Sequence, residues 1–218
     1  MGAISLAGVA IIDQDECVEC GVCLRAEVCL SDALIYEVAS WPRSVRATFS
    51  NPLTEHKETR IPGRGTEEMK TNDVTGRFKL GWVGLGVELG RPGIGTRFQD
   101  VNKVAQVLAK VGVQFEPRNP VTCLMVDTGT GKINPEVLNE KVLSAIIECT
   151  FPLERTPEVM RTLKEVSQEI DTVCSVDFIT RLEPDGEVPT ERILSEIGAP
   201  YSINGKNNVG LGRPLAER

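Results

Sequence analysis

The chain of 218 residues has a single histidine, His56, and only 5% aromatic residues. One imidazole excludes metal sites built from several histidines and makes histidine-based catalysis a poor expectation. No apolar run approaches the roughly 20 residues that a helix needs to span a membrane, and the N-terminus lacks the basic start and apolar core of a signal peptide. We therefore expect a cytoplasmic protein that does not use a membrane as partner.

A surplus of basic charge is also lacking, because 24 Lys and Arg residues stand against 31 Asp and Glu residues. This balance argues against a nucleic-acid partner that is bound through its phosphates. Most of the formal charge of −7 lies at one end, since residues 1–40 contain seven acids and one base. The charges predict an acidic module at 1–40, a basic irregular connector at 41–78, a nearly neutral domain at 79–183 and a C-terminal extension at 184–218.

Cysteine is the informative residue type, and four of the seven cysteines lie in the acidic module. Cys17, Cys20 and Cys23 are spaced C-x2-C-x2-C, and Cys29 follows after five more residues. Three thiolates at this spacing can turn around one corner of an iron–sulfur cube, with each thiolate binding one iron. Gly21 suits a tight turn where the chain passes close to such a group, and short strands at 11–13 and 33–36 are expected to hold the loop.

Residues 11–36 resemble the bacterial-type [4Fe–4S] ferredoxin motif. The resemblance implies one [4Fe–4S] cluster, one-electron transfer, and Cys17, Cys20, Cys23 and Cys29 as ligands of the metal. Zinc bound by four thiolates is the alternative, although such sites more often use two separated C-x2-C pairs. A disulfide framework is not expected in a cytoplasmic protein.

The motif departs from the family pattern at its end, where three residues and a following proline are usual. Here five residues precede Cys29, Leu30 follows it, and the chain has no second cysteine triad. The fourth ligand is therefore either Cys29, which we favour, or a remote cysteine. We expect Cys123, Cys149 and Cys174 to be small buried strand residues.

From residue 79 onward, apolar spacing predicts strand–helix–strand twice. The expected elements are a strand at 80–89, a helix from an N-cap at Asp100 to Gly112, strands at 113–115 and 145–151, a helix at 156–170 and a strand at 174–178. The expected fold class is α+β: the small iron–sulfur module followed by a ferredoxin-like βαββαβ sandwich, with a four-stranded sheet and two helices on one face. Further predictions are a strand at 121–126, a helix at 135–142, a helix near 190–197 and glycine-rich coil after it.

The other motifs of the sequence are less specific for a function. Residues 128–132 fail the phosphate-loop pattern and predict a turn, while the glycines at 84 and 86 leave room for Trp82 or a neighbouring segment. The loop at 90–96, with Arg91 and Arg97, offers an anion site, although a plain structural loop is favoured. We expect connector 41–78 to be a long loop with at most a short strand and a solvated His56, and we predict no catalytic residue.

These features favour an electron-transfer protein over a stand-alone enzyme: a dedicated carrier or a small subunit of a redox complex in a reducing, anaerobe-like setting. An acidic face would steer docking onto a basic face of the redox partner, and it is formed by Asp13, Asp15, Glu16, Glu19 and Glu27. Two alternatives remain: an ACT-like ligand-binding regulator with a redox- or oxygen-sensing cluster, and a cluster used only as a structural staple. Self-association into a homo-oligomer also stays open.

Overall fold

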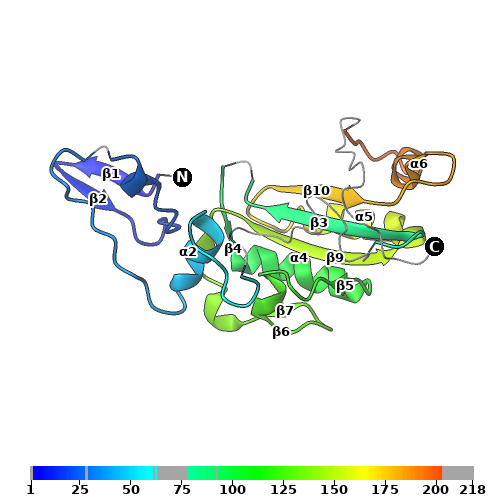
Figure 1. The fold of residues 1–218 in the computed structure, drawn as a ribbon, viewed down its shortest axis with the longest axis horizontal. Helices are drawn as coiled ribbons and strands as arrows, with labels where there is room; N and C mark the ends of the chain where they lie inside the picture. Colours follow the sequence, from blue (N-terminus) through cyan, green and yellow to red (C-terminus); the bar gives the residue numbers. More distant parts are fainter. Residues whose placement is uncertain (1, 28, 61, 63–77, 92, 203–218) are drawn as a thin grey trace.

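An antiparallel four-stranded sheet with helices packed against it forms the larger part of the molecule (Figure 1). The computed structural model describes residues 2–27, 29–60, 62, 78–91 and 93–202. Among these, no helix is long and apolar enough to cross a membrane. The mixed helix and sheet content confirms the α+β class.

The sheet contains the four strands that the apolar alternation predicts, in the order β10-β3-β9-β5. Each neighbouring pair is antiparallel, so β3 and β5 run in the same direction with β9 between them. The strand bounds are β3 Trp82–Leu89, β5 Gln114–Phe115, β9 Ala145–Pro152 and β10 Cys174–Ile179.

Two amphipathic helices, α4 (Phe98–Lys110) and α5 (Thr156–Val166), cover one face of this sheet. Both helices contribute to a single core with the alternate, fully buried residues of β3 and β9. Helix α4 begins two residues before the expected N-cap, so Asp100 lies buried in its first turn and pairs with Lys103 at 2.9 Å. Helix α5 ends at Val166 rather than at residue 170.

Close packing on the opposite face of the sheet accounts for the glycine at position 84 of β3. A Cβ atom on Gly84 would lie 2.2 Å from Cε1 of Phe78, whose side chain is buried. Only glycine lets the Phe78 ring lie this close to the strand. The neighbouring segment that the glycines were expected to accommodate is therefore the one that contains Phe78.

The prediction of an irregular connector at 41–78 is wrong for its first part. Residues Ser44–Ser50 form helix α2, in which Val45, Ala47 and Phe49 are buried. Phe49 packs edge-on against Phe98 of α4, with ring centroids 5.1 Å apart. The rest of the connector that the structure describes contains one isolated bridge, between Glu55 and Pro62, and residues 63–77 lie outside the described part.

The short elements between the two halves also differ from expectation. The predicted strand at 121–126 is a 3-10 turn, Thr122–Leu124, followed by β6 (Met125–Asp127). The predicted helix at 135–142 is a 3-10 turn, Pro135–Val137, followed by β8 (Lys141–Val142). Strand β6 pairs with β7 (Lys132–Ile133), so the turn predicted at 128–132 is confirmed as a hairpin turn at residues 128–131, and β8 pairs with β4 (Thr96–Arg97).

The two ends of the described chain lie far apart (Figure 1). At the N-terminal end, β1 (Ile4–Ala7) and β2 (Val9–Ile12) form a hairpin, and the cysteine loop with its short helix α1 (Val22–Arg25) follows. At the other end, α6 (Pro189–Glu196) confirms the helix that we expected near 190–197. The glycine-rich segment after residue 202 lies outside the described part. The remaining short element is the 3-10 turn Leu153–Arg155 before α5.

Candidate metal-binding loop

The cysteine loop follows strand β2 and is shaped by local hydrogen bonds. The Cys17 amide donates to the Asp13 carbonyl at 2.9 Å. The Asp13 carboxylate accepts from the amides of Asp15 and Glu16, at 2.9 and 3.2 Å. Gly21 adopts a left-handed conformation with φ 66°, which confirms the expected tight turn between Cys20 and Cys23.

The strands around the loop differ from those expected. Strand β2 forms before the loop, but it pairs with β1, and residues 33–36 do not form a strand. The expectation failed because the N-terminal residues supply the pairing partner. As a result, the segment after Cys29 is not fixed by a sheet ladder, and Leu30 and Ile35 have highly exposed side chains.

All four predicted ligands are half-buried. Cys29 Sγ accepts a hydrogen bond from the Ala33 amide at 3.3 Å and lies 3.6 Å from Ser31 Oγ. The hydrogen bonds from Ser31 and then from the Ala33 amide lower the pKa of the Cys29 thiol. Such an environment favours the thiolate, which is the form that binds metals.

The structure brings these cysteines into one region but does not gather their sulfur atoms. In the part of the chain that the structure describes, no group of three or more Cys, His, Asp or Glu side chains is arranged to hold a metal ion. The chemistry of the donor set nevertheless suits an iron–sulfur cluster, because four thiols and a glycine turn lie within thirteen residues.

The backbone amides of the loop also suit an iron–sulfur cluster. The amides of residues 18–23 donate to no other protein group that the structure describes. Among them Val18 is buried, with 6% of its surface exposed. A buried amide without an acceptor is costly, and hydrogen bonds from amides to sulfur are one way a protein holds and tunes such a cluster.

Cations from outside the acidic module bind this loop. Arg46 of α2 is 4% exposed, and its Nη1 donates to the carbonyls of Gln14, Asp15 and Cys17 at 3.0, 3.0 and 2.7 Å. Its Nε donates to Glu140. The positive charge of Arg46 is thus matched by a carboxylate while its Nη1 holds the loop backbone.

Three more cations pair with acids that were assigned to the docking face. Arg43 pairs with Glu19 at 2.6 Å, Arg97 pairs with Asp15 at 2.7 Å, and Lys141 pairs with Glu16. The hydrogen bond and charge of Arg97 lower the pKa of Asp15. Three of the five acids therefore face partners in the same chain, and among the described ion pairs none involves Asp13 or Glu27.

The loop at 90–96 does not present free cations for an anion. Arg91 pairs with Glu88 at 3.3 Å, and Arg97 is engaged by Asp15. A Cβ on Gly90 would lie 2.8 Å from the carbonyl carbon of Gly95, so close packing accounts for this glycine. These contacts support the interpretation of this segment as a structural loop.

The other three cysteines lie in the larger part of the molecule. Cys149 is fully buried in β9, as expected, and burial raises its pKa. Cys174 lies half-buried in β10, and burial raises its pKa as well. The expectation is wrong for Cys123, which lies in a 3-10 turn and is exposed, because the chain turns there instead of forming a strand.

Sequence reasoning missed the cations that hold the loop. Arg46 lies 29 residues after Cys17, and Lys141 lies 125 residues after Glu16. An amphipathic pattern was present, since Val45 and Phe49 are four residues apart. That pattern could have identified α2 and thereby placed Arg46 near a packed surface.

Comparison with known proteins assigns no family. No protein-family model matches the chain, and no curated protein or solved structure matches it significantly.

Proposed function

We propose that the chain carries one [4Fe–4S] cluster on Cys17, Cys20, Cys23 and Cys29 and transfers single electrons to and from a redox enzyme. The observation that carries this proposal is the combination of four closely spaced thiols with a run of backbone amides that lack acceptors among the protein groups the structure describes. When bound, the cluster supplies a one-electron redox centre. The side chains of the loop bind and orient it, and they need no acid–base chemistry.

The partner in this proposal is a cytoplasmic oxidoreductase or a larger redox complex with a basic docking face. The ligand thiols are half-buried rather than enclosed in the core, so a partner can approach the centre closely. Asp13 and Glu27 are the acids of the predicted docking face outside the described ion pairs. We therefore assign electrostatic steering of a basic partner mainly to these two acids.

The larger part of the chain serves in this proposal as a ferredoxin-like βαββαβ sandwich that supports the loop. Its support is the strand order β10-β3-β9-β5 and the placement of α4 and α5 against one face. The fold alone does not specify a function. Because Arg91 and Arg97 both pair with carboxylates, no observation favours a ligand-binding regulator over electron transfer.

The test is a set of single Cys→Ser variants reconstituted anaerobically with iron and sulfide. We expect Cys17→Ser, Cys20→Ser and Cys23→Ser to lose the visible absorption of the cluster. Cys29→Ser should retain at most a three-iron form, because one corner of the cube loses its ligand. Absorption and iron content are the measurements.

Cys174→Ser is the matched control, because Cys174 is also half-buried but lies in β10. Its iron content should equal that of the wild type. Full cluster content in Cys29→Ser together with loss in the Cys174 variant would instead identify a remote fourth ligand. Full iron content in the Cys17, Cys20 and Cys23 variants would contradict the proposal.

A further inference from the structure

Two arginines hold the backbone carbonyls of the first two predicted ligands. Arg46 Nη1 donates to the Cys17 carbonyl at 2.7 Å, and Arg25 Nη2 donates to the Cys20 carbonyl at 2.8 Å. Both guanidinium groups are anchored on the α2 side of the loop. Arg46 belongs to α2 itself and also binds Glu140, and Arg25 Nη1 donates to Asn51, the residue after α2, at 3.0 Å.

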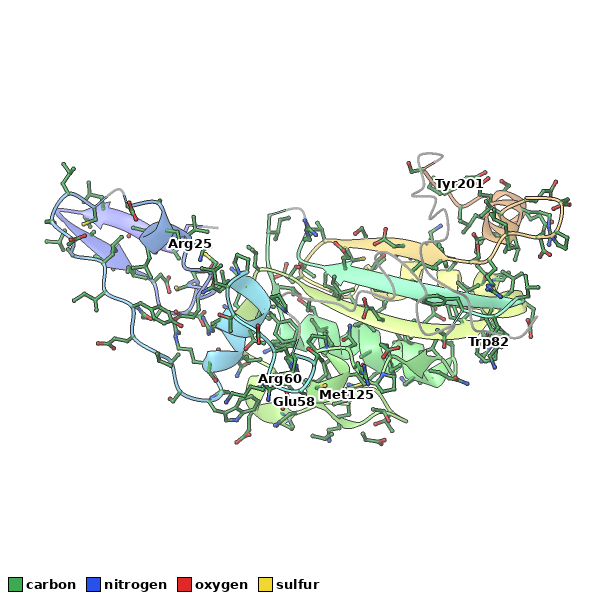
Figure 2. The ribbon with its side chains drawn as sticks, viewed as in Figure 1. Arg25, Glu58, Arg60, Trp82, Met125 and Tyr201 are labelled. Carbon is green, nitrogen blue, oxygen red and sulfur yellow. The ribbon has the colours of Figure 1, made fainter. Side chains whose placement is uncertain are left out.

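The approach of Arg25 depends on Gly21. A Cβ atom at this position would lie 2.7 Å from Arg25 Nη1, closer than real side chains pack. Gly21 therefore serves two purposes, because it also adopts the left-handed conformation with φ 66°. Figure 2 shows Arg25 on the part of the N-terminal module that faces α2.

These contacts fix the direction of two amides. In a trans peptide the C=O and the next N–H point in opposite directions. Because the Cys17 and Cys20 carbonyls point at guanidinium groups, the amides of Val18 and Gly21 point away from them. Neither amide donates to another described protein group.

We infer that Arg46 and Arg25 are positioning residues that aim the Val18 and Gly21 amides at the sulfur atoms of the bound cluster. This inference rests on the proposed function. An amide that donates to sulfur stabilises the extra negative charge of the reduced state and so raises the reduction potential. The two arginines act on the potential through the peptide groups that they hold.

The experiment compares Arg25→Lys and Arg46→Lys with the wild type, each reconstituted anaerobically. Lysine keeps the positive charge but lacks the planar group with several donors that holds the carbonyl and its second partner together. We expect iron content to stay at the wild-type level. The equilibrium constant for reduction should fall about tenfold, which is about 59 mV for one electron, as measured by EPR-monitored redox titration.

Arg192→Lys is the matched control, because Arg192 is exposed on α6 and pairs only with Glu196 among described residues. Its potential should equal that of the wild type. Arg46 is buried, so its variant is checked for folding by circular dichroism; should it unfold, the test rests on exposed Arg25.

Two failures are distinguishable. A wild-type chain that takes up no iron overturns the proposed function, and this inference with it. A wild-type chain that binds four irons, with unchanged potentials in the folded Lys variants, overturns the inference alone. A lowered potential in a folded Lys variant, with the Arg192 control unchanged, supports it.

Discussion

His56 is the only imidazole of the chain, and its environment differs from the solvated one that we expected. It is 5% exposed, packs edge-on against Phe49 with ring centroids 6.5 Å apart, and accepts a hydrogen bond at Nδ1 from the Thr59 amide at 3.3 Å. Burial lowers the pKa of His56, and the charge of Glu58 offsets part of this effect. The folded state therefore favours the neutral imidazole.

This environment predicts that His56 makes the fold sensitive to acid. Because its pKa is lower in the folded state than in the unfolded chain, the unfolded state binds the proton more readily below about pH 6.5. The contribution of neutral His56 is fully present above that value. It decreases as the pH falls toward the folded pKa, and thermal unfolding of the wild type between pH 7.5 and 5.5 is the measurement.

The control is His56→Gln, which cannot titrate but keeps a polar side chain. Carboxylates titrate in both proteins, so the informative quantity is the difference between their unfolding free energies. The wild type should lose stability relative to the variant as the pH decreases. A constant difference across this range would show that His56 does not contribute to the pH dependence.

At single positions, the sequence predicted residues whose role depends on local spacing. The left-handed turn at Gly21 is of this kind and is confirmed, whereas the ligand role of the motif cysteines stays a prediction. It did not predict Arg46 or the burial of His56, because both depend on contacts with residues far along the chain. Charged side chains are usually solvated and histidines are often partly so, and packing at the α2 surface buries both residues here.

Helix α2 joins the N-terminal module to the sheet and its helices. Phe49 is 1% exposed and contacts Phe98 of α4, while the Ser50 hydroxyl accepts a hydrogen bond from the Leu143 amide at 2.8 Å. The same helix carries Arg46. Apolar burial on one side of α2 thus fixes the position of the cation that binds the cysteine loop.

Phe49→Ala should lower the free energy of unfolding by about 3–5 kcal/mol, the usual cost of removing a buried phenylalanine ring. Chemical denaturation measures this change. Leu53→Ala is the control, because Leu53 is 75% exposed and should have little effect. Equal effects in the two variants would contradict the packing of α2 described above.

Long periodic elements were predicted well, and short ones were not. Strands β3 and β9 and helices α4 and α5 each bury a regular apolar pattern, so periodicity identified them. The segments between residues 121 and 142 form elements of two or three residues. Their conformation depends on partners elsewhere in the chain, such as β4 for β8, and a local pattern does not contain that information.

At the scale of the whole molecule, several of the surplus acids in the first forty residues form ion pairs with cations of the same chain. Asp15, Glu16 and Glu19 face Arg97, Lys141 and Arg43. Exposed ion pairs contribute about 0–1 kcal/mol each, and these three pairs are partly exposed, so each alone adds little stability. Together with the backbone contacts of Arg46, they place the cysteine loop against α2, β4 and β8. The sequence showed the unequal charge but not which cations face it.

The most direct test of the central claim is the metal content of the chain after anaerobic reconstitution with iron, sulfide and zinc together, followed by EPR of the reduced protein. We predict four iron atoms per chain and an EPR signal that appears on one-electron reduction, as expected for a [4Fe–4S] cluster. One zinc ion per chain, no iron and no signal on reduction would contradict the account.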